Sequence, residues 1–350
     1  MKEEIIKTLK DLLSFKTYKD NKLEFDKLFN YIKKEYKSLN IEEYVFDNKK
    51  CLVLSNSKSH DLDIIFCCHI DVVYADDYSI KEDNDNLYGR GTIDMKGSTA
   101  VCLNIMKNLN TDKKIALFIT SDEEVDGYTA SCLVKEYNSK FAIVPDGGSN
   151  FELISEEKGL MQLKLSVNTK SCHAAQLFNG ENAIVKLFDV YKKIIEKYPL
   201  PKSNNDYITS INLSKLNGGT SNNQVPGYAE MILDIRNIKS DSLAEILKFI
   251  KNIDKDVKVE TIITGPTFST NLNNKYVKQY ISSCKKILNK DIKIIGCEST
   301  SDAIFFSEKN IPTVIMNPCG YYAHSPQEYV NKNSLLDLYN IYYDFIKEFK

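Results

Sequence analysis

A histidine and an aspartate, two residues apart, follow a short apolar run early in the chain. The run at residues 64–68 predicts a buried strand, and His69 and Asp71 stand at its end. Because side chains alternate between the two faces of a strand, these two point to the same side. A metal-bound histidine usually donates its second ring N–H to a carboxylate, which sets its tautomer. The pair therefore predicts a metal ligand with its orienting carboxylate, although a surface histidine in a polar loop shows the same spacing.

Further acidic residues and another histidine follow other apolar runs. A loop with glycine at both ends, residues 89–97, contains an aspartate, and the apolar runs 114–120 and 141–144 each lead into acidic residues. In an α/β sheet, functional side chains gather beyond the carboxyl ends of the strands. The side chains that this rule brings together with His69 are Asp94, Glu123, Glu124, Asp146 and, after the last predicted strand, His324.

Such a cluster of carboxylates needs positive charge close to it. Carboxylates buried together would each lose several kcal/mol of solvation or take up protons. Two divalent cations supply four positive charges, which Asp94, Glu124, Asp146 and a bridging hydroxide would balance. Histidine and carboxylate ligands around an open position suit zinc, with cobalt or manganese as substitutes. The residue types thus predict a site for two Zn²⁺ ions.

The composition narrows the class of protein. The 350 residues are 43% hydrophobic and 27% charged, with a net charge of −2 and both signs interspersed. This balance predicts a globular protein that binds neither nucleic acid nor a membrane surface, and no apolar run approaches the ~18 residues that a membrane span needs. Nine cysteines without a Cys-x-x-Cys pair read as reduced thiols. We expect a cytoplasmic protein.

The elements that must position the cluster form an α/β pattern with an insertion. Apolar runs alternate with helical patterns in residues 1–157 and 266–350, which predicts a catalytic domain with a mixed sheet flanked by helices. Between them, residues 158–265 show the order β-α-β-β-α-β in strands that alternate apolar and polar residues. This order predicts an inserted ferredoxin-like α+β domain.

Five marks in order resemble one family of enzymes along nearly the whole chain. They are His69-Ile-Asp71, Gly89-Arg-Gly-Thr-Ile-Asp94-Met-Lys-Gly, Thr120-Ser-Asp-Glu123-Glu124, Pro145-Asp146-Gly-Gly and His324. The sequence is similar to the co-catalytic zinc peptidases and amidohydrolases that include acetylornithine deacetylase, succinyl-diaminopimelate desuccinylase, glutamate carboxypeptidase, aminoacylase and related di- and tripeptidases. The resemblance implies that His69 and Asp146 bind one zinc ion, that Glu124 and His324 bind the other, and that Asp94 bridges both.

The resemblance also implies catalytic roles outside the ligands. Glu123 would be the general base that takes a proton from the bridging water and hands it to the leaving amine. Asp71 would orient His69. The insertion corresponds to the family's lid and dimerisation domain, so a homodimer is expected, with His173 stabilising the tetrahedral oxyanion. The alternative for His173 is an exposed histidine at a strand end.

Substrate contacts follow from the same resemblance. Arg236, fourteen residues after Asn222, matches an arginine that grips a substrate carboxylate, and a bidentate guanidinium suits an α-carboxylate. A solvated ion pair at a strand end is the alternative for Arg236. Ser299 and Thr300, in the run Ser299-Thr300-Ser301-Asp302, resemble a turn that lines the substrate pocket. The alternative is that a serine or threonine of this run caps the helix that follows, and the two roles are compatible. Glu298 replaces a glycine of the family pattern; it would favour a substrate with a free amine, or it is a surface residue.

These features predict a dinuclear metallohydrolase that cleaves the amide bond of a small N-acyl amino acid with a free carboxylate. A di- or tripeptidase, or a glutamate carboxypeptidase-like exopeptidase, is the nearest alternative. A catalytically idle metal-binding scaffold is a more distant one, which the complete ligand set and Glu123 disfavour. A two-metal phosphoesterase also uses histidine and aspartate in an α/β site, but the paired glutamates and the ferredoxin-like insertion argue against it.

Overall fold

The computed structural model describes residues 1–203 and 206–350. The chain forms two compact units. The larger unit contains residues 1–155, 270–295 and 301–350, and the smaller unit contains residues 156–269 and 296–300. The predicted insertion, residues 158–265, includes residues 204 and 205, which lie outside the described part of the chain.

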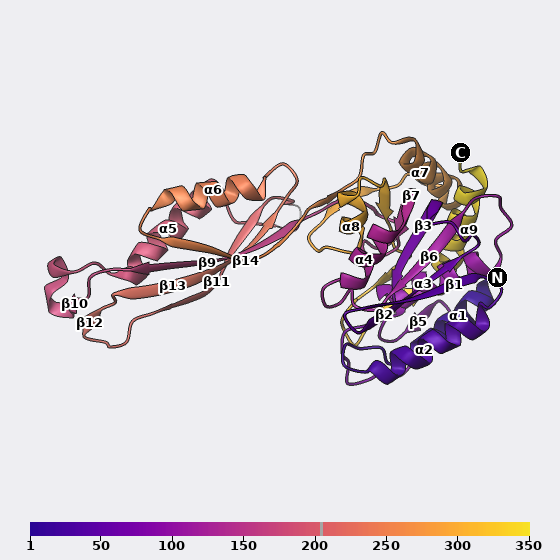
Figure 1. Ribbon diagram of the computed structural model, residues 1–350, viewed down its shortest axis with the longest axis horizontal. Coiled ribbons are helices and arrows are strands. Elements are labelled where there is room, and N and C mark those ends of the chain that lie inside the picture. Colours follow the sequence, from indigo (N-terminus) through magenta and orange to yellow (C-terminus); the bar gives the residue numbers. More distant parts are fainter. Residues whose placement is uncertain (204–205) are drawn as a thin grey trace. The chain divides into compact units, whose positions relative to one another are not determined.

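A mixed nine-stranded sheet organises the larger unit, as the sequence pattern predicted (Figure 1), although β15 and the last residues of β8 and β16 count toward the smaller unit. Its path is β1-β2-β6-β3-β7-β17-β8-β15, and β16 pairs with β8. The central strands β3, β6, β7 and β17 run parallel to their neighbours in that group, whereas β1 and β2 are antiparallel. The strands are β1 (Asn40–Phe46), β2 (Lys49–Ser55), β3 (Asp61–His69), β6 (Ile115–Thr120), β7 (Asn138–Val144), β8 (Leu153–Glu157), β15 (Phe268–Ser269), β16 (Ile294–Cys297) and β17 (Thr313–Ile315).

Parallel pairing aligns the carboxyl ends of the central strands. His69 at the end of β3 lies in register with Thr120 at the end of β6. Val144 at the end of β7 lies in register with Ile315 at the end of β17. The continuous apolar runs of β3 and β6 are buried on both faces, as expected for strands covered by helices on each side. Residues that follow these strands are therefore delivered to one edge of the sheet.

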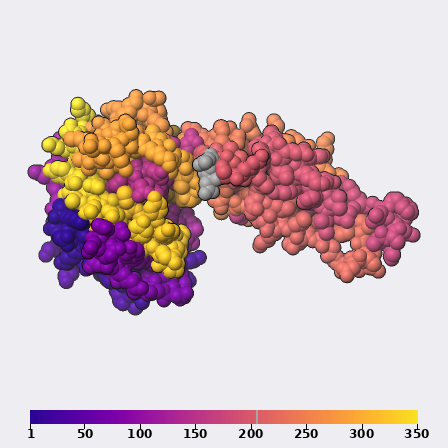
Figure 2. All heavy atoms as spheres, turned by 180° about the vertical axis from the view of Figure 1, so that it is seen from behind, coloured from indigo at the N-terminus to yellow at the C-terminus, as the bar shows by residue number. Residues whose placement is uncertain are grey.

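Helices cover the faces of this sheet. Helix α1 buries Ile5, Leu9 and Leu12 at helical spacing, and α3 is buried along nearly its whole length. The first and last helices, α1 and α9, contact each other, and Figure 2 shows the indigo N-terminal and yellow C-terminal segments on one face of the larger unit. The helices are α1 (Lys2–Leu13), α2 (Lys22–Glu35), α3 (Gly97–Lys107), α4 (Tyr128–Glu136), α7 (Lys275–Leu288), α8 (Ala303–Glu308) and α9 (Lys332–Glu348).

A second, small sheet of the larger unit has the order β18-β19-β5-β4. It joins β4 (Lys81–Glu82) and β5 (Asn86–Tyr88), which precede the loop of Asp94, to β18 (Gly320–Tyr321) and β19 (Tyr329–Asn331), which flank His324. The sequence pattern gave no sign of β4 and β5, because these strands are only two and three residues long. They link two loops that are far apart in the chain.

The smaller unit is an antiparallel sheet of order β11-β13-β9-β14 with two helices packed on one face. Alternate residues of β9 and β13 are buried against the helices, which explains their period of two. A two-stranded sheet, β10-β12, belongs to the same unit. The elements are β9 (Gly159–Asn168), β10 (Cys172–His173), a 3₁₀ turn (Ala174–Asn179), α5 (Ala183–Lys197), β11 (Ser210–Gly218), β12 (Gln224–Val225), β13 (Tyr228–Asn237), α6 (Leu243–Ile253) and β14 (Lys258–Gly265).

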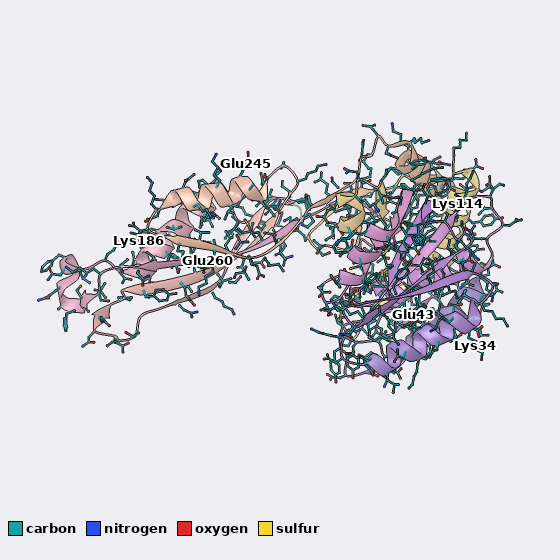
Figure 3. All side chains as sticks on the ribbon, viewed as in Figure 1. Lys34, Glu43, Lys114, Lys186, Glu245 and Glu260 are labelled. Carbon is teal, nitrogen blue, oxygen red and sulfur yellow. The ribbon has the colours of Figure 1, made fainter. Side chains whose placement is uncertain are left out.

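Charged side chains of both signs stand on the outside of both units. Figure 3 labels Lys34, Glu43 and Lys114 on the larger unit and Lys186, Glu245 and Glu260 on the smaller one. Among the described residues, no helix has the length and apolar character that crossing a lipid bilayer requires.

Candidate metal centre

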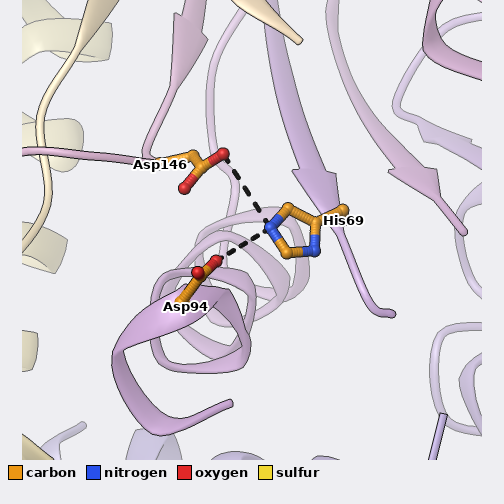
Figure 4. Close-up of side chains that lie close together, drawn as sticks. All are labelled: His69, Asp94 and Asp146. Atoms are coloured by element: carbon orange, nitrogen blue, oxygen red, sulfur yellow. Dashed lines mark hydrogen bonds and ion pairs between the residues drawn. The ribbon is translucent and has the colours of Figure 1, made fainter. Parts of the chain in front are cut away.

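The parallel strands deliver most of the chemically active side chains to one place. His69 is the last residue of β3, and Asp146 follows β7 (Figure 4). Glu123 and Glu124 follow β6. Asp94 comes from a turn, Thr92–Lys96, directly before α3; its backbone angles there are not helical, and its peptide bond to Met95 is cis. His324 lies between β18 and β19.

Two groups of ligand-type atoms share one aspartate. His69, Asp94 and Asp146 form the first group, and Asp94, Glu124 and His324 form the second; within each group the candidate ligand atoms lie within 4.8 Å of one another. Asp94 presents a different oxygen to each group. Its Oδ1 is 3.0 Å from His69 Nε2, and its Oδ2 is 2.9 Å from His324 Nε2. This is the arrangement of a bridging carboxylate.

The remaining contacts complete both groups. His69 Nε2 is 3.8 Å from Asp146 Oδ2, and Figure 4 shows how the Asp94 and Asp146 carboxylates converge on this ring nitrogen. In the second group, His324 Nε2 is 3.0 Å from Glu124 Oε1. His69 is almost fully buried, whereas half of the His324 side chain is exposed. The second group is therefore the more accessible of the two.

The pKa shifts in the cluster follow from several carboxylates buried close together. Burial raises the pKa of Asp146 to about 7, and the nearby Asp94 charge adds to this effect. Burial also raises the pKa of Glu123 well above its usual value, with repulsion from Asp146 adding to it. Burial opposes the charged form of His69, but hydrogen bonds to Asp71 and Asp94 raise its pKa well above normal. Bonds to Asp94 and Glu124 raise the pKa of His324 to about 10.

The donor set therefore fits divalent cations. Four carboxylates and two imidazoles converge, and the carboxylates raise the pKa of both imidazoles because they attract positive charge. Nitrogen and oxygen donors in two groups of three suit zinc and similar ions. Asp94 keeps a pKa below its usual range because bonds from His324 and His69 outweigh the effect of its burial. An ionised, doubly contacted Asp94 is what a shared ligand requires.

Asp71 contacts one residue of each ligand group. His69 Nδ1 meets the backbone carbonyl of Asp71 at 3.0 Å and its carboxylate Oδ1 at 3.5 Å, so Nε2 is the nitrogen that faces the ligand group. Asp71 Oδ2 accepts the backbone N–H of Glu124 at 2.9 Å. Oδ1 is buried, and its contact with His69 Nδ1 is longer than an ordinary hydrogen bond. Asp71 thus contacts the first group through His69 and the second through Glu124.

Glu123 stands beside the cluster without belonging to either group. Its Oε2 is 4.0 Å from His69 Nε2, and its side chain is largely buried. The turn that carries it is built by Asp122, whose carboxylate accepts the N–H of Thr129 and pairs with Lys49 at 2.9 Å. Asp122, the acidic neighbour in the same run, is therefore a structural residue, while the Glu123 carboxylate lies near His69.

Sequence reasoning assigned no role to Asn317, which positions the Asp146 loop. Asn317 is buried after β17. With its amide nitrogen turned toward Ser98 and Pro145, it donates to Ser98 Oγ at 3.0 Å and to the Pro145 carbonyl, and its oxygen accepts the Gly147 N–H at 3.0 Å. Asn317 thus bonds the residues on either side of Asp146. No local spacing could reveal this role, because the partners are far apart in the sequence.

Replacing Asn317 by leucine is expected to destabilise the fold, because it leaves the Pro145 carbonyl and the Gly147 N–H without partners. Each unsatisfied buried group costs roughly 1–3 kcal/mol. Urea denaturation followed by circular dichroism measures the change in the free energy of unfolding. An unchanged midpoint would show that Asn317 does not hold this loop.

The smaller unit carries the other predicted residues. His173, in β10, is exposed, and its Nδ1 accepts the backbone N–H of Ala175 at 3.2 Å. Asn222 is exposed in the turn before β12. Arg236 lies on β13, and its Nε donates to Asp234 Oδ1 at 2.8 Å. The ion pair that the sequence left open for Arg236 is therefore present.

The segment with Glu298, Ser299 and Thr300 also belongs to the smaller unit. Glu298 Oε2 lies 2.5 Å from Nζ of Lys158, which is buried, so this carboxylate already serves as a counter-ion. Ser299 Oγ lies 3.1 Å from the thiol of Cys297. At the start of α8, the hydroxyl of Ser301 accepts the backbone N–H of Ala303 at 3.3 Å. A serine of the predicted turn, Ser301, therefore bonds the start of that helix, as the capping interpretation of residues 299–302 expected.

Known proteins resemble this chain in sequence and in fold. The model of peptidase family M20/M25/M40 matches residues 65–348. The succinyl-diaminopimelate desuccinylase of Rickettsia bellii is 30% identical over 332 residues, which cover 85% of this chain and 83% of that protein. Among solved structures, the aminopeptidase PepT from Bacillus cereus has a TM-score of 0.82 at 19% identity, covering 99% of this chain and 98% of its own.

A further solved structure with the same fold is the Bacillus subtilis YXEP protein, described as a dinuclear metal binding peptidase from the M20 family. It has a TM-score of 0.73 at 10% identity and covers 99% of this chain and 97% of its own.

Proposed function

This chain belongs to peptidase family M20/M25/M40, and from that premise we propose that it hydrolyses the amide bond of a small N-acyl amino acid with a free α-carboxylate. The observation that carries the proposal is the pair of ligand groups that share Asp94, with Glu123 beside them. Hydrolysis of amide or peptide bonds agrees with the activities of the relatives. The N-acyl substrate and the two-ion mechanism go beyond them and are the proposal.

The two groups would hold two divalent cations. His69 and Asp146 would bind one ion, Glu124 and His324 the other, and Asp94 both. Zinc suits these ligands, and cobalt or manganese could replace it. When bound, such ions would polarise the scissile carbonyl and lower the pKa of a water molecule between them.

Glu123 would act as general base and then as general acid. Its carboxylate lies beside the cluster but belongs to neither ligand group, so it is free to accept a proton. It would take one proton from the attacking water as oxygen adds to the amide carbon, and pass that proton to nitrogen as the C–N bond breaks. The products are a carboxylic acid and an amine, and Glu123 returns to its starting state; the remaining proton of the acid passes to the amine or to solvent, which leaves a carboxylate.

His173 would stabilise the oxyanion that forms during this addition. A ring nitrogen that accepts an N–H bond carries no proton, so the bond from Ala175 to Nδ1 places the proton of a neutral His173 on Nε2. Nε2 is then a donor on an exposed side chain. This supports a neutral hydrogen-bond donor rather than a base.

We expect His173→Ala to lower kcat about 10²- to 10³-fold with little change in KM, because the donor is needed only when charge develops on the carbonyl oxygen. Steady-state kinetics on the best substrate measures both constants. His60→Ala is the matched control, since His60 is also exposed but stacks on Tyr137. A raised KM with an unchanged kcat would contradict the assignment.

The smaller unit would serve as lid and dimerisation domain, with the protein acting as a homodimer. Arg236 would bind the substrate carboxylate through its terminal nitrogens, because its Nε is engaged by Asp234. Asn222, Ser299 and Thr300 would complete the substrate contacts. Glu298 is a weak candidate for an amine contact, because its carboxylate neutralises Lys158.

A di- or tripeptidase is the second candidate, because the aminopeptidase PepT shares the fold over the full chain. Hydrolysis assays with the zinc- or cobalt-loaded protein would compare N-acetyl- and N-succinyl-amino acids with dipeptides and tripeptides, with chelated protein as control. Turnover of acylated amino acids alone supports the proposal, and turnover of peptides alone replaces it with the peptidase. No turnover with two ions bound would favour a metal-binding scaffold.

A further inference from the structure

Glu328 is a buried carboxylate just after the exposed segment that carries His324. Residues 321–324 are exposed, whereas only 1% of the Glu328 side chain is. Its Oε1 accepts the backbone N–H groups of Ile93 at 3.1 Å and Asp94 at 3.3 Å. A side chain from the His324 segment therefore holds the backbone of the shared ligand Asp94.

A buried arginine balances this charge. Arg90 Nη1 donates to Glu328 Oε2 at 2.8 Å, and only 6% of the arginine side chain is exposed. A lone carboxylate at this depth would be costly, so the pair must form for Glu328 to stay ionised. The backbone supports the same contact, because the Gly89 N–H donates to the Glu328 carbonyl at 3.0 Å and β5 pairs with β19.

The contact joins two ligands of the same group. Asp94 is held through its own N–H, and His324 lies four residues before Glu328 in the chain. Asp94 Oδ2 and His324 Nε2 lie 2.9 Å apart. His324 also has a positive φ of 65°, a backbone conformation that needs support from its surroundings. Within the described part of the chain, the Glu328 carboxylate bonds to Arg90, Ile93 and Asp94, and forms no hydrogen bond or ion pair with His69 or Asp146.

We propose that Glu328, paired with Arg90, is a positioning residue that sets Asp94 and His324 for the cation of the second group. The inference rests on the proposed function, because it presupposes that the two groups bind cations. Asp94 and His324, the two ligands that Glu328 positions, occur together only in the second group. Loss of the Glu328 carboxylate should therefore weaken mainly the binding of the second ion. A purely structural ion pair would instead affect the fold and both ions alike.

The test is calorimetric titration of Zn²⁺ into chelator-treated wild type and Glu328→Gln, with folding checked by circular dichroism. Glutamine keeps the size but loses the charge that pairs with Arg90. We expect the affinity for the second ion to fall about 10- to 100-fold, the usual cost of losing a partner of a ligand, with the first ion nearly unaffected. Titration with Co²⁺ should show the same selective loss in the visible absorption of the second site.

Val330→Ala is the matched control, since Val330 is buried in β19 beside Glu328 but its side chain is apolar. It should lower stability and leave both affinities unchanged. If Glu328→Gln fails to fold, Glu328→Asp keeps the charge with a shorter reach and should show the same selective loss. Unchanged affinities in folded variants, or equal loss of both ions, would overturn the inference. Wild type that binds fewer than two ions would overturn the proposed function instead.

Discussion

Glu123→Gln should lower kcat about 10²- to 10⁴-fold while the protein keeps both cations. Glutamine has the same size as glutamate but cannot accept the proton of the attacking water. Because Glu123 lies outside both ligand groups, its replacement removes no ligand atom. The loss should appear in kcat and in kcat/KM alike, as expected for a group that acts in the transition state. Steady-state kinetics and metal analysis by mass spectrometry on the same preparation test this result.

The control for this variant is Glu136→Gln, an exposed glutamate at the end of α4 whose loss should change nothing. Glu124→Gln gives the opposite comparison, since it removes a ligand of the second group and should lower metal content. Near-normal turnover in Glu123→Gln would remove Glu123 as the base. Loss of metal together with activity would show that Glu123 is a ligand.

The sequence predicted the α/β architecture because the central strands are buried on both faces. Such strands are continuous apolar runs, as at residues 64–68 and 115–119, and parallel pairing then brings the residues that follow them together. The structure places His69, Asp94, Glu124, Asp146 and His324 within contact distance as two groups. Binding of metal by these groups stays a prediction.

Residues that position the cluster escaped sequence reasoning for a physical reason. Glu328 and Asn317 act through backbone groups more than 150 residues away, such as the N–H of Asp94 and the carbonyl of Pro145. Backbone groups are identical at every position, so no residue type marks them as partners. Glu298 shows the reverse case, in which a suggestive acidic residue turned out to neutralise a buried lysine, Lys158.

Asp94→Ala should remove both cations and reduce activity to the background rate. Asp94 is the only residue that the two groups have in common, so its loss leaves two ligands in each. The remaining histidines would also lose a charge partner, since both imidazoles lie within about 3 Å of Asp94. Metal content after dialysis against trace Zn²⁺ should fall from two ions per chain to none.

Variants of ligands that belong to one group should behave differently. Asp146→Ala is expected to lose the ion of the first group, and His324→Ala that of the second, so each should keep one ion. Since His324 is half exposed and His69 is buried, the second ion should also exchange faster in wild type. The ion count of each variant follows directly from which atoms the two sites have in common. If Asp94→Ala kept one ion while Asp146→Ala or His324→Ala lost both, Asp94 would therefore not be the shared ligand.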